Sequence, residues 1–163
     1  MKKIILLFFC IFNFVFIACK EPGIDMSKTG VEVDKDNYKT GEEININIYG
    51  NYLLEEKILG GKIIIYICKK ENEKEGKFKI TKINSNEVSL SEQLLDKEID
   101  VYALDLEPTQ NQVYLANLDY LITILINEPA DYFLIIDLRL TANQIIDGYT
   151  EMKRFSIPFT VTN

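Results

Sequence analysis

The sequence predicts an all-β fold: a β-sandwich of seven or eight mostly antiparallel strands, with a small β-barrel as the alternative. Two observations lead to this prediction. Apolar and polar residues alternate over most of the chain after residue 30, which is the pattern of half-buried strands. Turn-forming residues separate these segments every 8–15 residues or so (about the spacing of a sandwich), and residues 91–96 form the one plausible helical turn. We expect residues 31–163 to form a single domain.

The predicted strands follow one another with clear separators. Residues 36–41 supply a turn between the first two strands. Residues 62–68 have no polar face, which predicts a central strand buried on both sides. The charged residues 69–77 are expected to form a solvated hairpin loop, and Pro158 places the last strand at a sheet edge or a bulge. The strand segments are residues 31–33, 44–49, 62–68, 78–83, 99–106, 118–126, 132–140 and 155–161.

The first residues of the chain have the organisation of a secretory signal. Lys2 and Lys3 precede an apolar run over residues 4–17, and a small residue, Ala18, stands directly before Cys19. The run is shorter than the ~20 residues that a membrane-spanning helix needs. A core element of the folded domain and a signal without lipid are the two alternative interpretations.

The stretch from Phe16 to Cys19 resembles the lipobox of bacterial lipoprotein precursors, with Phe16 where leucine is commonest. Spirochaetal lipoproteins are known for such loose boxes. The resemblance implies that residues 1–18 are removed by cleavage between Ala18 and Cys19, and that Cys19 carries lipid. Several acyl chains hold a protein stably on a membrane surface. Residues 19–30 are then expected to be the lipidated cysteine and a short tether.

A second resemblance concerns the mature part. Residues 38–46, with a tyrosine and a glycine ahead of alternating isoleucines, resemble the second-strand entry of bacterial immunoglobulin-like domains. Residues 155–161 are similar to the final strand of those domains. The resemblance implies an immunoglobulin-like architecture, although the Cys…Trp…Cys core of antibody domains is absent.

Composition excludes several function classes. The chain has no histidine, which removes Ser-His-Asp and Cys-His catalytic machinery and the commonest metal ligand. Without residues 1–18 the chain keeps 16 basic and 25 acidic residues, a net charge of −9, which argues against a nucleic-acid partner. We therefore predict no enzymatic activity, no cofactor and no metal. Cys68 would have no disulfide partner if Cys19 carries lipid, and it is expected to be a small buried apolar residue.

Three groups of residues are candidate sites. Ile145, Ile146 and Tyr149, in the loop before the last strand, form a candidate partner-binding loop, or else they pack under the sandwich.

Asp137 and Arg139 are either a recognition pair or charges neutralised by cross-strand neighbours. Asp34 and Asp36 begin a calcium-loop pattern that lacks the required glycine, and an Asx turn explains them equally well.

The sequence thus predicts a lipoprotein held on the outer membrane of a bacterial envelope by lipid on Cys19, with the surface and the periplasmic leaflet both open. It would act as a non-catalytic binding module with a protein partner, as a surface antigen or adhesin or as an envelope assembly factor. The alternative is a carrier that binds a small apolar ligand inside a barrel.

Overall fold

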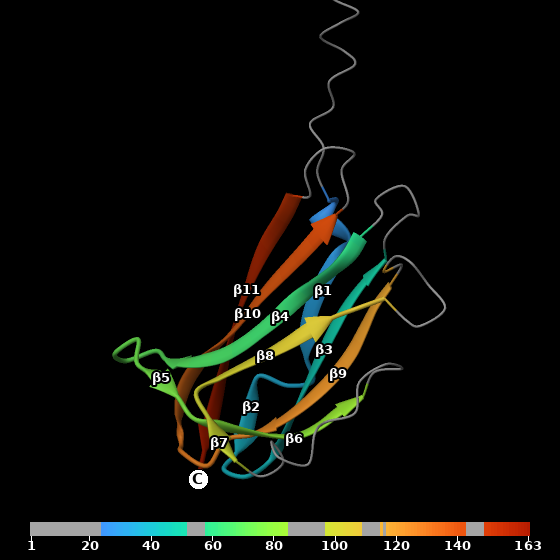
Figure 1. The fold of residues 1–163 in the computed structure, drawn as a ribbon. Coiled ribbons are helices and arrows are strands. Elements are labelled where there is room, and N and C mark those ends of the chain that lie inside the picture. The colour runs from blue at the N-terminus through green and yellow to red at the C-terminus, as the bar shows by residue number, and fades with distance from the viewer. Residues whose placement is uncertain (1–23, 52–57, 85–96, 109–114, 116, 143–148) are drawn as a thin grey trace, which may run out of the picture.

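The computed structural model describes residues 24–51, 58–84, 97–108, 115, 117–142 and 149–163, and these form a two-layer β-sandwich (Figure 1). The predicted fold class is confirmed. Within these ranges eight strands have five or more residues, and three further strands have only two or three. The two sheets remain separate layers, so the barrel alternative is wrong, and with it the barrel cavity of the carrier hypothesis.

The first sheet is antiparallel throughout its described pairs. Its order is β1 (Thr29–Val33), β3 (Glu43–Asn51), β9 (Asn117–Leu125), β6 (Phe78–Asn84) and β7 (Glu98–Ile99).

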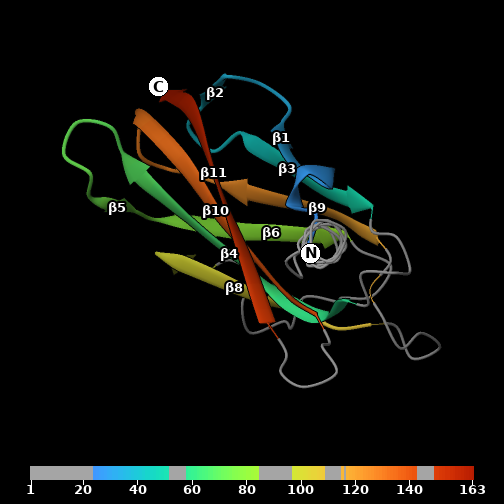
Figure 2. The same ribbon diagram turned by 90° about the horizontal axis from the view of Figure 1, so that it is seen from above.

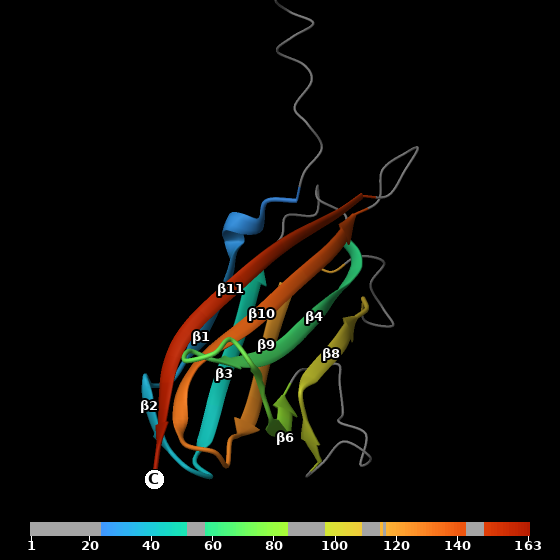
Figure 3. The same cartoon turned by 90° about the vertical axis from the view of Figure 1, so that its left-hand side faces the viewer.

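The second sheet begins with a parallel pair, β2 with β11, and continues antiparallel. Its order is β2 (Asn37–Lys39), β11 (Tyr149–Thr162), β10 (Ala130–Ala142) and β4 (Ile58–Lys69), and the far edge of β4 pairs with both β8 (Val101–Leu106) and β5 (Glu75–Gly76). Figure 3 shows this sheet toward the viewer, and Figure 2 shows its strands running obliquely across those of the first sheet.

The core lies between the sheets and is built by the alternation seen in the sequence. Inward-facing side chains are mostly isoleucine and leucine, whose branched chains pack well on a pleated surface. An aromatic group closes one end: the ring of Tyr132 stacks on that of Phe159 at 5.5 Å, and the ring of Tyr38 meets Phe159 edge-on at 6.1 Å. Ile44, Ile46, Ile48, Ile63, Ile65, Ile67, Leu134, Ile136 and Leu138 are among the residues with 1% exposure or less.

Three sequence predictions are corrected by the sheet topology. Residues 99–106 are not one strand, because the chain passes at Asp100 from β7 in the first sheet to β8 in the second. The hairpin predicted at residues 69–77 is present, but its return strand is β5, which pairs with the end of β4, and not residues 78–83, which lie in β6 of the first sheet. Within residues 36–41, Asn37–Lys39 form β2, and only the residues after them turn. The predicted helical turn at residues 91–96 lies outside the described residues.

The described part of the predicted tether is packed on the domain. Ile24 belongs to the core with 6% exposure, a 3-10 turn (η1) covers Met26–Lys28, and β1 begins at Thr29. The folded region therefore extends from residue 31 back to Ile24. The η1 turn and the C-terminus lie at opposite ends of the sandwich (Figure 1).

The prediction for Pro158 is confirmed, because β2 covers only the last residues of β11. The Thr160 N–H donates to Asp36 O at 2.9 Å, and the Thr40 N–H donates to Thr162 O at 2.7 Å. Even-numbered residues of β11 therefore direct their backbone groups away from β10. Pro158 is even-numbered, so its missing N–H removes no bond from the β10–β11 ladder.

No helix in the described ranges is long and apolar enough to cross a membrane.

Candidate functional site

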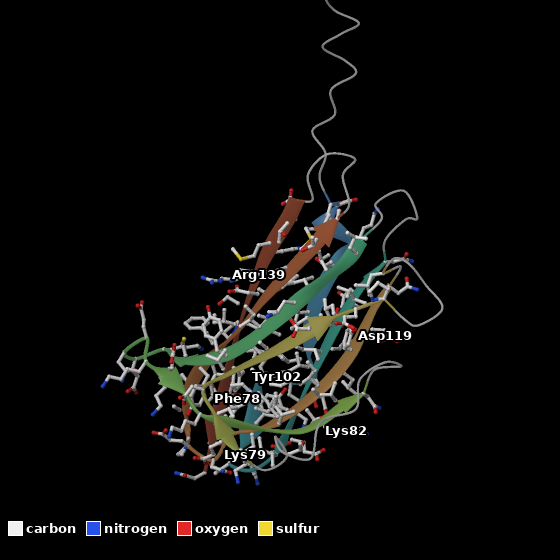
Figure 4. All side chains as sticks on the ribbon, viewed as in Figure 1. Phe78, Lys79, Lys82, Tyr102, Asp119 and Arg139 are labelled. Atoms are coloured by element: carbon white, nitrogen blue, oxygen red, sulfur yellow. The ribbon has the colours of Figure 1, made fainter. Side chains whose placement is uncertain are left out.

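The outer faces of the two sheets differ in chemistry. The first sheet has the polar outer face that is usual for an antiparallel sheet, with Lys79 and Lys82 on β6 and Asp119 on β9 (Figure 4). On the same face the Thr123 hydroxyl donates to Asn45 Oδ1 at 3.0 Å. The second sheet instead carries a row of apolar side chains outward, and this contrast singles it out.

We call this row the outer strip, defined as Ile64, Tyr66, Val101, Phe133 and Ile135. These residues are neighbours across strands, since Ile135 faces Tyr66 and Tyr66 faces Val101 in the sheet register. Val101 is 47% exposed and Phe133 37%, while the other three are half-buried. The sequence prediction that residues 62–68 are buried on both sides is therefore wrong for the outer side, because no described element packs over it. Large contiguous apolar patches on a protein surface mark interaction sites, which makes the outer strip a candidate.

An ion pair lies beside the outer strip. The Asp137 carboxylate accepts two hydrogen bonds from Arg154, at 2.6 Å from Nε and 2.8 Å from Nη2. The Asp137 side chain is only 6% exposed and the Arg154 side chain 56%. The hydrogen bonds from Arg154 lower the pKa of Asp137 even though burial opposes this. Cross-strand neutralisation of Asp137 was one of the two sequence interpretations, and the structure identifies Arg154, not Arg139, as its partner.

A hollow of about 440 Å³ lies on the same face, beyond the ion pair. It is lined by Leu59, Gly60, Gly61, Lys62, Arg139, Thr141 and Thr150. Gly61 lets β4 approach β10 closely, because a Cβ there would lie 2.1 Å from Arg139 O. The Lys62 ammonium is 3.1 Å from Asp105, whereas no described residue bonds the guanidinium of Arg139, which points outward (Figure 4). The hollow therefore adds positive charge to one end of the outer face.

The calcium pattern has a structural explanation. Asp34 accepts hydrogen bonds from the Tyr38 hydroxyl at 2.7 Å and from the Asn45 backbone N–H at 3.1 Å. The carboxylate thus braces the end of β1 against the start of β3, and the Lys35 N–H also donates to the Tyr38 hydroxyl at 2.9 Å. Within the described ranges no three acidic or cysteine side chains gather as a metal site would require.

Cys68 is half-buried rather than buried, because it points outward from β4 beside Phe133. Burial, with the negative charges of Glu75 and Glu73, raises the pKa of its thiol. The thiol is therefore not activated as a nucleophile.

The structure does not place the other predicted site residues on the outer strip. Ala18, Cys19, Ile145 and Ile146 lie outside the described residues, and Tyr149 is the first residue of β11. Sequence reasoning missed the outer strip, although its signal was visible. A strand with no polar face, such as residues 62–68, is either covered on both sides or presents apolar side chains to a partner.

Comparison with known proteins adds little to this description. No family model matches the sequence, and no curated protein matches it. Among solved structures, the chain is similar to AggA, the major subunit of aggregative adherence fimbriae type I from Escherichia coli. The two share 11% sequence identity with a TM-score of 0.43, over 82% of this chain and 94% of that chain. This likeness is too low to carry an argument about function.

Proposed function

We propose that this chain is a lipoprotein precursor whose mature β-sandwich is anchored in a bacterial outer membrane by lipid on Cys19. It acts there as a non-catalytic binding module that receives a protein partner on the outer strip. The anchoring part of the proposal is supported by the basic start, the apolar run and the small residue before Cys19.

The observation that carries the binding part is the uncovered outer strip. When one face of a sheet is exposed to water, the side chains on that face are expected to be polar, as they are in the first sheet. The second sheet keeps apolar side chains there on β4 and β10 and at the first residue of β8. Beside them, the buried Asp137 carboxylate is held to the exposed Arg154 by two hydrogen bonds, so the pair forms an oriented polar border next to the apolar residues.

The absence of histidine, a raised pKa at Cys68 and a carboxylate already bonded at Asp137 all favour binding over catalysis. The immunoglobulin-like resemblance of residues 38–46 and 155–161 fits this role, because such sandwiches present their strands and loops to partners. The surface antigen or adhesin and the envelope assembly factor both remain forms of this function.

Photo-crosslinking from single positions tests the binding part. A photoreactive amino acid at Phe133 lies in the outer strip, and one at Tyr49 lies on the outer face of the first sheet with similar exposure, 39% against 37%. We expect cells that express the full chain to give a defined adduct from position 133 and none from position 49. Equal adducts from both positions, or none from 133, would contradict the outer strip as the binding surface.

Anchoring is tested separately by metabolic labelling with palmitate. The wild-type chain should incorporate label and the Cys19→Ala chain should not. Protease added to intact cells then assigns the leaflet: digestion while a periplasmic control protein survives places the domain on the surface. A wild-type chain that is secreted without label would remove the anchor from the proposal and leave the outer strip to be judged by its own test.

A further inference from the structure

The longest unpaired strand edge in the described structure belongs to β11. This strand pairs with β10 along all but its last residue, from Tyr149↔Ala142 to Val161↔Ala130, with no bulge. On its other side it pairs only with β2, at residues 160–162. Between residues 149 and 159 no described strand covers that side. We call residues 150–156 of this side the free edge.

The free edge has backbone groups ready for a further strand. Because even-numbered residues of β11 direct their N–H and C=O away from β10, residues 150, 152, 154 and 156 present both groups outward. Natural proteins usually blunt an edge with proline, a bulge, short strand length or charged side chains. The charged residues here, Glu151, Lys153 and Arg154, are of both signs, so they repel some registers of a second strand and favour others. The proline of this strand lies beyond the free edge at position 158, and the regular register shows no bulge within it. We infer that this edge pairs with another strand.

We propose that the partner is the same edge of a second copy of this chain, paired antiparallel about a twofold axis at Met152. Such an interface is self-complementary, and it joins two second sheets into one continuous sheet. The charges along β11 select the register. With Met152 opposite its own copy, Glu151 of each copy lies opposite Lys153 of the other, and Thr150 lies opposite Arg154.

Neighbouring registers are unfavourable. Centring the axis on Glu151, Lys153 or Arg154 places that residue opposite its own copy, and like charges directly opposite each other destabilise a sheet. Centring it on Phe155 or beyond runs the incoming strand into β2, which already occupies the edge from Thr160. The Met152 register pairs residues 149–155 without either conflict.

The position of the N-terminal residues is compatible with this pair. Lys153 Nζ donates to Met26 O at 2.8 Å and to Thr29 O at 3.1 Å, so η1 lies beside the centre of the proposed interface. These contacts come from the inner face of β11, and no described strand pairs with its free edge. In each copy the described chain therefore begins close to the middle of the proposed pair.

The consequence for binding is that the two outer strips face the same side. An antiparallel edge pair has its twofold axis normal to the sheet, so the outer faces of both copies are continuous. Met152, which is 55% exposed on that outer face, sits at the junction. Self-association thus goes beyond the proposed binding function, because it would occur whether or not a partner docks on the outer strip.

Disulfide trapping tests the register. In washed membranes from cells that express the full chain with Cys68→Ser, we compare Met152→Cys with Thr150→Cys after mild oxidation. Across the axis the two Cα atoms at position 152 lie about 5.5 Å apart, within the range that a disulfide spans. Two cysteines at position 150 lie roughly 13 Å apart, since four residues separate them along the strands.

We expect a covalent dimer from the Met152→Cys chain, at least several-fold above the Thr150→Cys chain and the Cys68→Ser parent. Adding Glu151→Lys should lower the dimer yield, because the introduced lysine then faces Lys153 of the other copy, and Glu151→Gln should lower it less. A Met152→Cys chain that stays monomeric, or equal yields at positions 150 and 152, would overturn the proposal. Protease resistance of each variant verifies that the fold is intact.

Discussion

The Asp137 carboxylate takes both of its side-chain hydrogen bonds from Arg154 on the next strand, although Arg139 lies only two residues away on its own strand. The strand register determines this partner, because Asp137 and Arg154 lie directly opposite each other in the β10–β11 pair. Residues i and i+2 of one strand point to the same face but lie farther apart than cross-strand neighbours. The pair therefore fixes the polar border of the outer strip.

Asp137→Asn is expected to destabilise the domain. The substitution removes a charged acceptor at a buried position, and hydrogen bonds to charged groups contribute about 1.5–3 kcal/mol. We expect the free energy of unfolding at pH 7 to fall by this amount, measured by urea denaturation. Asp119→Asn, at an exposed position on the other sheet, is the matched control and should change it by less than about 0.5 kcal/mol.

The Asp137 contribution should also depend on pH. Its pKa is lowered in the folded protein, so the stabilisation is complete above the unfolded-state pKa of about 3.9 and is lost as the pH falls through the lower folded-state value. The difference in unfolding free energy between wild type and Asp137→Asn should therefore be constant from pH 7 to about pH 5 and narrow toward pH 3. A difference that stays constant down to pH 3 would show that ionisation of Asp137 is not the cause.

Gly61→Ala is expected to separate the central strands. The added Cβ would lie 2.1 Å from Arg139 O, a backbone atom that cannot move without shifting β10 from β4. Overpacking of this kind costs typically about 1–3 kcal/mol, which thermal unfolding can measure. Gly41→Ala is a useful contrast, because no atom lies within 4 Å of its Cβ position and only its positive φ of 75° opposes the change. A smaller loss at Gly61 than at Gly41 would contradict the packing argument.

Proline scanning of β11 should follow residue parity. Ser156→Pro removes an N–H that faces the free edge, whereas Ile157→Pro removes one that faces β10. We expect Ile157→Pro to cost about 1–3 kcal/mol more, since it leaves a carbonyl of the central β10 strand without its donor. Denaturation midpoints of the two variants, with hydrogen exchange at β10, give the comparison. Equal losses would mean that both sides of the strand are paired.

The sequence predicted the strands well where a residue pattern alone decides the structure. The alternation at Ile44, Ile46 and Ile48 reappears as the buried face of β3, and Pro158 lies at an unpaired edge as expected. It failed at Asp100, where the core-facing positions shift phase from Ile99 to Tyr102 because the chain changes sheets.

The candidate site was harder to predict for a physical reason. The residues around Ile64 and Tyr66 show that both faces of β4 are apolar, but a local pattern does not reveal whether another layer covers the second face. Likewise, the partner of Asp137 is 17 residues away in sequence and becomes its neighbour only through the register of β10 with β11.

The burial of Ile24 leaves only a short linker between the proposed lipid anchor at Cys19 and the folded domain. If Cys19 carries the lipid, the first side chain in the core follows the anchor by only about five residues, and a fully extended chain of that length reaches about 17 Å. The domain then has little freedom to tumble or to lean away from the bilayer. It can therefore contact only molecules close to the membrane surface, so its binding partner must lie in that layer or be able to enter it.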